Sequence, residues 1–156
     1  MADALSPQDR SAHMARIRRA NTQPELVVRR LLHRLGYRFR TQFAKVPGRP
    51  DVAFPGRKKC VQIHGCFWHA HGCQLSRVPK TRTEFWRQKF ERNQERDARL
   101  EDAATAAGWA TLTIWECETK DLEALSARLT EFLGERRVSP VRDRRRLATP
   151  SAPAAR

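Results

Sequence analysis

The segment HGCFWHAHGC, residues 64–73, contains three of the five histidines and two of the four cysteines of the chain, placed around a Phe-Trp pair. Imidazole and thiolate are the ligands that zinc prefers, and histidine also carries protons near neutral pH. A tetrahedral site takes four donors, so five donors within ten residues, with Cys117 also available, exceed the need of one structural zinc. The segment therefore predicts a metal site beside a second chemical site.

The charge balance indicates a polyanionic partner. The chain has 156 residues and a formal net charge of +14, and contacts from lysine and arginine to phosphates dominate nucleic-acid affinity. Charge alone does not separate DNA from RNA or anionic lipid. No apolar run approaches a membrane span, and the start MADALSPQDR lacks the features of a signal peptide. We therefore expect a cytoplasmic protein with no membrane partner, whose cysteines are metal ligands or core thiols.

At this length we expect one folded domain with a core of its own. Residues 1–12 are polar and predict a flexible N-terminus, followed by a single domain over 13–134. Residues 135–156 contain an RDRRR run and an Ala/Pro/Ser ending, with too few apolar side chains to fold. They predict a basic disordered tail.

Apolar periodicity predicts the elements that must position the reactive side chains. Helical spacing predicts helices over residues 13–20, 22–35, 82–107 and 121–133. Alternation predicts strands over residues 37–43, 51–54, 59–64 and 109–115, with the second and third forming a hairpin. Along the first strand, one side would carry Tyr37, Phe39, Thr41 and Phe43. The patterns Thr22-x-x-Glu25 and Thr81-x-x-Glu84 predict capping boxes at two helices.

The order helix, three strands, helix, strand, helix favours an α/β fold with a mixed central sheet flanked by helices, as in the restriction-endonuclease-like nucleases. The segment GRPD, residues 48–51, looks like the Pro-Asp start of their metal-binding motif. Glu-x-Lys normally completes that motif on the next strand, where this chain has Gln62-Ile63-His64. The usual second carboxylate and lysine are absent, and Pro-Asp alone is also a common turn.

One family shares this departure, and the chain resembles it from about residue 10 to residue 133: the very short patch repair (Vsr) endonucleases. The resemblance rests on five blocks in order, which are PGRPD, HGCFWHxHxC, VPxTRTEFW, NxERD and GWxxLxxWEC. It implies a restriction-endonuclease-like fold with a structural zinc site. It also implies a Mg²⁺-dependent DNA mismatch endonuclease that nicks double-stranded DNA 5′ of the thymine in a T:G mismatch. Such mismatches arise when 5-methylcytosine deaminates, and the nick initiates very short patch repair.

The resemblance implies roles for individual residues of the hydrolytic site. Asp51 and the backbone carbonyl of Ile63 would hold Mg²⁺, for which oxygen ligands are suited. His64 and His69 would be the catalytic histidines, either of which could accept or donate a proton. Asp97 would orient His69, as a third group holds a base in place. A lone strand histidine is more often structural, but His64 lies at the register of the missing Glu-x-Lys motif.

Glu25 has two interpretations. Its place three residues after Thr22 predicts a capping carboxylate, whereas the resemblance implies a position near the metal, acting through water. Both interpretations can hold together.

The resemblance implies that the zinc ligands are Cys66, His71, Cys73 and Cys117. Three thiolates and one imidazole make a closed tetrahedral set, so the ion would be structural. Cys60 is left over and is expected to be an ordinary buried thiol.

The resemblance also implies a DNA-binding surface. The aromatic side chains that would enter the duplex beside the mismatch are Phe67, Trp68 and Trp86. Met14 would approach from the minor groove. The side chains that would contact the mismatched bases are those of Lys89 and Asn93. Adjacent residues in a loop are not expected to face one core, which favours exposure of Phe67 and Trp68 over burial. Trp86, Lys89, Asn93 and Asp97 share one face of the expected helix, although an ordinary solvated face has the same spacing.

The implied partner is double-stranded DNA in the bacterial nucleoid, bound by a monomer. A companion cytosine methyltransferase is implied as well, and a link to mismatch-repair proteins stays open. Two alternatives remain: a related restriction-like nuclease with another target, and a noncatalytic zinc-stabilised DNA-binding module. The module would explain the charge and the cysteines but gives no reason for Asp51, His64, His69 and Asp97 to occur together.

Overall fold

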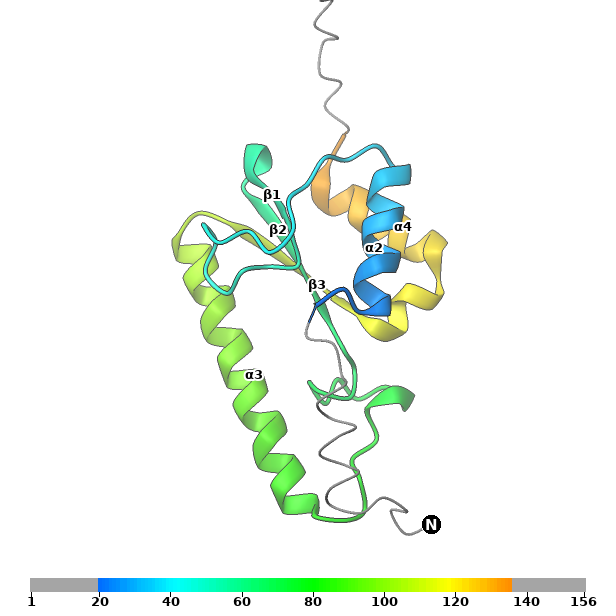
Figure 1. Cartoon of the computed structure of the whole chain (residues 1–156), viewed down its shortest axis with the longest axis vertical. Coiled ribbons are helices and arrows are strands. Elements are labelled where there is room, and N and C mark those ends of the chain that lie inside the picture. Colours follow the sequence, from blue (N-terminus) through cyan, green and yellow to red (C-terminus); the bar gives the residue numbers. More distant parts are fainter. Residues whose placement is uncertain (1–19, 136–156) are drawn as a thin grey trace, which may run out of the picture.

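The computed structural model describes residues 20–135, so Met14, residues 13–19 of the first predicted helix and residues 136–156 of the predicted tail lie outside the described residues. The elements in chain order are α2 (Gln23–Arg34), β1 (Val52–Phe54), β2 (Lys59–His64), α3 (Thr83–Ala106), β3 (Ala110–Trp115) and α4 (Leu122–Leu133) (Figure 1). Short 3-10 helices lie at Pro55–Arg57, Gln74–Ser76 and Glu116–Lys120. Three predicted helices and three of the four predicted strands are therefore confirmed. None of the described helices is long and apolar enough to cross a membrane.

The three strands form one mixed sheet in the order β1-β2-β3. β1 and β2 are the predicted antiparallel hairpin, with Val52 opposite Val61. β2 and β3 run parallel over six residues, from Lys59 opposite Ala110 to His64 opposite Trp115. Parallel neighbours need a crossover, which α3 supplies. The carboxyl ends of β2 and β3 consequently lie side by side.

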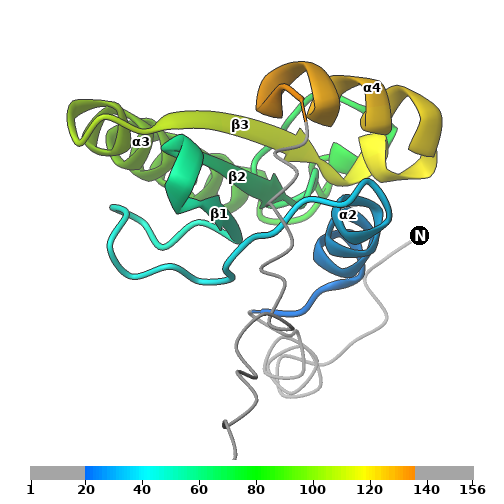
Figure 2. The same ribbon diagram turned by 90° about the horizontal axis from the view of Figure 1, so that it is seen from above.

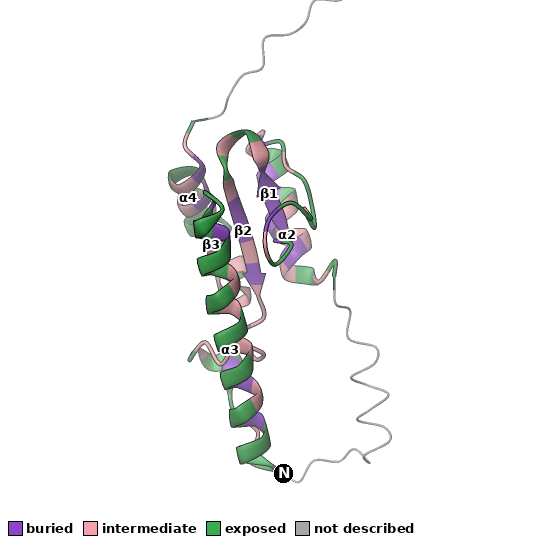
Figure 3. Ribbon diagram, turned by 90° about the vertical axis from the view of Figure 1, so that its left-hand side faces the viewer, coloured by how far each residue is buried: buried purple, intermediate pink, exposed green. Residues whose placement is uncertain are grey.

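Helices cover both faces of the sheet, with α2 and α4 on one side and α3 on the other (Figure 2). The larger core lies between the sheet on one side and helices α2 and α4 on the other, and it includes Val28, Leu32, Val61, Ile114 and Leu129. The smaller core lies under the last turns of α3 and consists of Val46, Ala53, Cys60, Ala104 and Trp109. Alternate residues of β1 and β2 enter the two cores, as the period of a strand requires. The outward side of α3 is exposed over most of its length (Figure 3).

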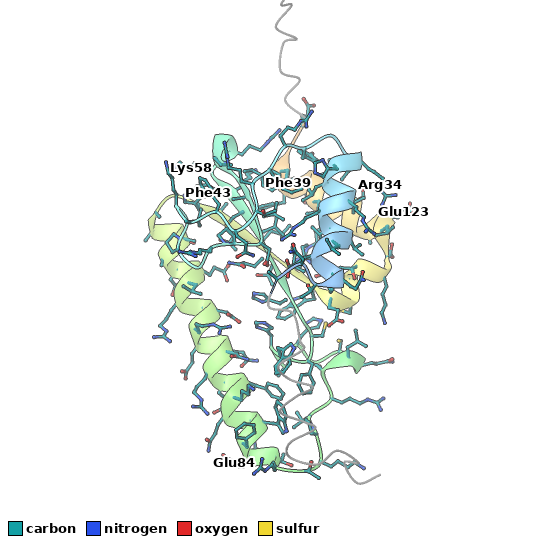
Figure 4. All side chains as sticks on the ribbon, viewed as in Figure 1. Arg34, Phe39, Phe43, Lys58, Glu84 and Glu123 are labelled. Carbon is teal, nitrogen blue, oxygen red and sulfur yellow. The ribbon has the colours of Figure 1, made fainter. Side chains whose placement is uncertain are left out.

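The predicted strand over residues 37–43 is wrong. In this segment Arg40 and Ala53 form an isolated bridge, with N–H···O distances of 2.9 and 2.8 Å. Gln42 then takes a φ of 48°, which turns the chain out of the extended conformation. Phe39 packs against the larger core while Phe43 packs against the smaller one, on the opposite face of the sheet (Figure 4). The four residues expected on one side therefore do not share a side, because the chain crosses the edge of the sheet.

Neither predicted capping box forms as expected. The Thr22 side chain accepts no bond from the helix backbone; its hydroxyl donates to Glu25 Oε1 at 3.0 Å. α3 begins after Arg82, which has a φ of 54°, so Thr81 lies outside the helix and cannot cap it. Glu84 instead accepts a hydrogen bond from Gln88 at 3.1 Å. Tertiary placement of the preceding loops overrides these local sequence signals.

Truncation of the larger core should destabilise the fold. Leu129→Ala removes a side chain that is 0 % exposed, and we expect a loss of about 2–5 kcal/mol in the free energy of unfolding. Leu122→Ala, on the same helix but 40 % exposed, should lose less than about 1 kcal/mol. Urea unfolding followed by circular dichroism measures both. Equal losses would contradict this assignment of the core.

Candidate active site

A cleft of about 790 Å³ opens at the carboxyl ends of β2 and β3. Its walls come from the first turn of α2, the start of β1, the end of β2 and the middle of α3. All of the predicted hydrolytic residues line it, namely Glu25, Asp51, Ile63, His64, His69 and Asp97. Residues separated by more than 70 positions in the chain thus meet at one place.

The two predicted catalytic histidines stack on one another. The rings of His64 and His69 have centroids 4.0 Å apart and are inclined by 3°. His69 Nδ1 lies 2.5 Å from Asp97 Oδ2. An ionised carboxylate only accepts hydrogen bonds, so Nδ1 carries the proton and Nε2 of the neutral ring is left as an acceptor. This arrangement of His69 is that of a base oriented by a carboxylate.

Burial keeps both imidazoles neutral. It is the largest cause that lowers the pKa of His64 to about 4, and the neighbouring His69 adds to this. Burial also lowers the pKa of His69, although the charge of Asp97 acts in the opposite direction. At neutral pH the two rings can therefore accept protons.

Helix α3 fixes the loop that carries His69. The amide of Asn93 donates to the Trp68 carbonyl oxygen at 2.8 Å, and the amide of Gln94 donates to the His69 carbonyl oxygen at 2.9 Å. The bond between Asp97 and His69 makes the third link between this helix and the loop. Backbone and side chain of His69 are consequently both held by α3.

Asp51 lies directly before β1 and presents its carboxylate to the cleft. The Ile63 N–H donates to Oδ2 at 2.7 Å, and Gln42 Nε2 donates to Oδ1 at 3.3 Å. Burial raises the pKa of the Asp51 carboxyl from 3.8 to about 6; the Ile63 bond lowers it, and the charge of Glu25 raises it further. A buried carboxylate of this kind favours a cation at the site, because a positive charge would lower that pKa.

Glu25 is 4 % exposed, and both of its carboxylate oxygens accept hydrogen bonds. Its carboxylate accepts bonds from the Thr22 hydroxyl, the Asn21 N–H at 2.9 Å and Arg29 at 2.9 Å. It therefore holds the start of α2 and also lines the cleft with Asp51. Glu25 thus bonds to the residues that precede α2, although not in the predicted capping box, and its place in the cleft beside Asp51 leaves the interpretation as a residue near the metal open to test.

The four predicted zinc ligands form a second cluster. The ligand atoms of Cys66, His71, Cys73 and Cys117 all lie within 4.8 Å of one another. Tetrahedral zinc with Zn–S bonds of about 2.3 Å separates its ligands by roughly 3.8 Å, so the four residues fit such an ion with small adjustments. Cys60 lies apart from them, buried in the smaller core with its Sγ 3.3 Å from Thr111 Oγ1.

The two clusters share one aromatic side chain that the sequence did not single out. Trp115, at the end of β3, stacks on His71 with ring centroids 4.3 Å apart and planes inclined by 10°. Its ring also meets His64 edge-on at 5.4 Å and His69 at 6.0 Å. Trp115 thereby packs the hydrolytic pair against a member of the cysteine and histidine cluster.

An aromatic cluster lies beside the cleft, under the first turns of α3. Phe67 contacts Trp68 at 5.1 Å, Trp86 at 5.3 Å and Phe90 at 5.5 Å between ring centroids. Trp68 also contacts Trp86, at 6.4 Å. The expectation that Phe67 and Trp68 would not face one cluster is therefore wrong, because the turn at residues 66–70 directs both side chains to α3.

Known proteins of one family resemble this chain. The family model described as DNA mismatch endonuclease Vsr matches residues 2–75. V.XorIIP, a type II nicking enzyme of Xanthomonas oryzae pv. oryzae, is 48% identical over 133 residues, which cover 85% of this chain and 98% of the relative. The DNA mismatch endonuclease Vsr of Escherichia coli K12 is 42% identical over 136 residues, 86% of this chain and 87% of the relative. The chain belongs to the Vsr family.

As a Vsr family member, the protein is an endonuclease that acts on DNA. A further relative, the type II nicking enzyme V.NaeI of Lentzea aerocolonigenes, is 42% identical over 117 residues, which cover 70% of this chain and 68% of the relative. The names of these relatives show that Vsr-like proteins include enzymes described as mismatch endonucleases and enzymes described as nicking enzymes.

Several residues of this Vsr site were missed by sequence reasoning. Gln42 contacts Asp51, Gln94 holds the loop, and Trp115 packs on three histidines. Trp115 is a specified residue of the block GWxxLxxWEC, which could have drawn attention to it, whereas Gln94 is the unspecified position of NxERD. Gln42 lies outside every block, and its proximity to Asp51 depends on the turn after Arg40.

Because the pKa of Asp51 is raised, replacing this carboxylate by a neutral amide should stabilise the folded protein, and the gain should depend on pH. Because folding raises the pKa, the charged carboxylate destabilises the folded state fully above about pH 6, and this effect disappears as the pH falls towards 3.8. Asp51→Asn should therefore unfold at a higher temperature than the wild type when no divalent cation is added. The difference should shrink as the pH is lowered from about 8 to about 4.

Differential scanning calorimetry across this pH range is the measurement. Asp102→Asn, at an exposed position of α3, is the matched control and should leave the unfolding temperature unchanged. A wild-type protein as stable as Asp51→Asn at the alkaline end would contradict burial of this carboxylate.

Proposed function

We propose that this Vsr protein nicks double-stranded DNA 5′ of the thymine in a T:G mismatch produced by deamination of 5-methylcytosine, and so initiates very short patch repair. The observation that carries the proposal is the meeting of Asp51 with the stacked pair His64 and His69 in one cleft, with Asp97 bonded to His69. The name of the Escherichia coli relative supports the mismatch as target.

The cation proposed for the cleft is Mg²⁺. Asp51 would hold it together with the Ile63 backbone carbonyl, and Glu25 would act through water. Mg²⁺ keeps several waters and needs few protein ligands, so one buried carboxylate in a polar cleft fits it. When bound, the ion would supply Lewis acidity at a phosphoryl oxygen. Asp97 is less suited as a metal ligand, because its carboxylate already accepts from both His69 and Arg96.

The proton transfers are assigned to the histidines. His69 would accept the proton of the attacking water at Nε2, since Nδ1 donates to Asp97. His64, stacked on it and neutral, would hold the His69 ring and the water in place. This assignment follows the donor directions in the cleft and leaves the departing oxygen as the 3′-hydroxyl needed for repair synthesis.

The second metal would be a structural Zn²⁺ bound by Cys66, His71, Cys73 and Cys117. A set of three thiolates and one imidazole leaves no open position for a substrate, so the ion would stabilise the loop and take no part in hydrolysis. It would join the loop after β2 to the end of β3.

Recognition of the mismatch is assigned to the aromatic cluster. Phe67, Trp68 and Trp86 would enter the duplex beside the T:G pair, where unstacking costs least because pairing is weak. Trp86 is 8 % exposed in the free protein, so the cluster would have to open for this side chain to insert. Lys89 lies 5.1 Å from the Trp68 ring centroid, and Asn93 lines the same cleft, which favours contacts from both to the bases. Met14 would approach from the minor groove.

The proposed partners follow from this substrate. Methylated cytosine would be supplied by a companion cytosine methyltransferase, and mismatch-repair proteins could act on the same lesion. A nuclease of the same chemistry with another target context is the second candidate, because relatives such as V.XorIIP and V.NaeI are named type II nicking enzymes. A noncatalytic binding module is disfavoured by the bond between His69 and Asp97.

End-labelled duplexes that differ only by T:G or C:G at one position test the function. With Mg²⁺ and several flanking contexts, we expect a nick 5′ of the thymine in the T:G duplex alone. Asp51→Ala should lose the nick, because the cation would lose its carboxylate. Equal cutting of the C:G duplex would reject the mismatch target, and tight binding without a nick in any context would support the binding module.

Metal analysis after dialysis tests the zinc assignment. The wild type should retain about one zinc per chain, whereas Cys117→Ser should retain much less and unfold at a lower temperature. Cys60→Ser is the matched control: this cysteine lies outside the cluster, and the variant should keep its zinc. Equal zinc in both variants would reject the four-residue site.

A further inference from the structure

Positive charge is scarce in the cleft, although the protein carries a net charge of +14. Among the described residues that line it, the permanent cations are Lys89 and Arg96. The carboxylates outnumber them and are Glu25, Asp51, Asp97, Glu101 and Glu116. A phosphodiester that enters this cleft therefore meets few groups that stabilise its negative charge.

The two cations serve different parts of the cleft. Lys89 Nζ lies 5.1 Å from the ring centroid of Trp68 and 5.3 Å from that of Trp86, so its charge is placed at the aromatic cluster. Arg96 lies seven residues later on α3, or about 10 Å further along the helix axis. Its Nη2 donates to Asp97 Oδ1 at 3.2 Å, beside the stacked histidines.

The side chain of Arg96 is directed to the cleft in an unusual way. Neighbouring residues on a helix point in different directions and do not normally meet. The bond between Arg96 and Asp97 therefore requires the arginine to bend over the face of α3 that carries Asp97. The side chain remains 55% exposed, and its other N–H groups make no hydrogen bond within residues 20–135.

Arg96 is linked to the hydrolytic histidines through Asp97. Asp97 accepts from Arg96 at Oδ1 and from His69 at Oδ2, so one carboxylate joins the two groups. Because one carboxylate separates the guanidinium from the His69 ring and both residues line the cleft, Arg96 lies close to the place where charge would develop beside these rings.

We propose that Arg96 binds a non-bridging oxygen of the scissile phosphodiester and stabilises the negative charge that grows there during hydrolysis. The proposal rests on the nicking function proposed above. In that reaction the water oxygen forms a bond to phosphorus while the bond from phosphorus to the 3′ oxygen breaks. The water proton passes to His69, and the 3′ oxygen takes a proton from solvent. Arg96 forms no covalent bond.

A guanidinium suits this role better than an ammonium. It is always charged, and its planar donors match two oxygens of a phosphate at once. One edge can keep Asp97 in place while another binds the phosphate. Fixed donors aimed at developing charge need no reorganisation during the reaction, which is why they contribute strongly to catalysis.

Three variants test the proposal under single-turnover conditions on the T:G duplex with Mg²⁺. Arg96→Met should lower the cleavage rate by about 100-fold, whereas its Kd for the same duplex without Mg²⁺ should rise by less than about tenfold. Arg96→Lys should recover part of the lost rate. Arg99→Met is the matched control: Arg99 is exposed on the same helix, is turned by about 200° from Asp97 and does not line the cleft, so the rate should stay within about threefold. Unfolding temperature and zinc content should match the wild type in all three.

A second comparison separates phosphate binding from positioning of Asp97. Arg96→Met added to Asp97→Ala should slow the reaction at least about tenfold beyond Asp97→Ala alone. Equal rates for the double and the single variant would show that Arg96 acts only through Asp97 and would overturn the proposal.

If the wild type nicks the T:G duplex and Arg96→Met nicks it equally fast, the role of Arg96 is overturned and the nicking function stands. If the wild type nicks no duplex, both are overturned.

Discussion

The parallel pairing of β2 with β3 is the constraint on which both clusters depend. It sets His64 beside Trp115, so the chain leaves the two strands at neighbouring points. The loop after β2 and the 3-10 helix after β3 consequently meet, and the Cys117 N–H donates a hydrogen bond to Cys66 Sγ at 3.3 Å. The crossover that parallel strands require is α3, and its length lets it continue past the sheet to hold the same loop. A shift of this register by one residue would turn each side chain of β2, His64 included, to the other face of the sheet and would separate both clusters.

The cleft combines buried ionisable side chains with positive charge beside them. Burial keeps the histidines neutral and raises the pKa of Asp51, so the free site resists additional negative charge. A cation at Asp51 and the guanidinium of Arg96 would offset this resistance from two sides of a phosphate. Charge elsewhere on the molecule would attract DNA, whereas the charges in the cleft would act on one phosphodiester. Different residues would thus provide the affinity for DNA and the hydrolysis of the phosphodiester.

Local sequence patterns predicted the elements well where burial and period agree, as in β1, β2, β3 and the three described helices. They failed at residues 37–43, where alternation suggested a strand but Phe39 and Phe43 pack on opposite faces of the sheet. The capping boxes failed because Thr and Glu at the right spacing do not fix the path of the preceding loop. The members of the cysteine and histidine clusters were predictable from residue type and resemblance. The contacts of Gln42, Arg96 and Trp115 were not, since they depend on which loops and strands meet.

The central claim is that one cleft holds the reacting phosphate between Asp51 and His69, beside a separate structural metal. X-ray diffraction from the protein bound to a T:G duplex, with Mn²⁺ in place of Mg²⁺ and anomalous data at the manganese and zinc edges, tests it most directly. We predict a manganese peak at Asp51, a zinc peak among Cys66, His71, Cys73 and Cys117, and the phosphate 5′ of the thymine in the cleft. Manganese bound between His64, His69 and Asp97, or a phosphate outside the cleft, would contradict the account.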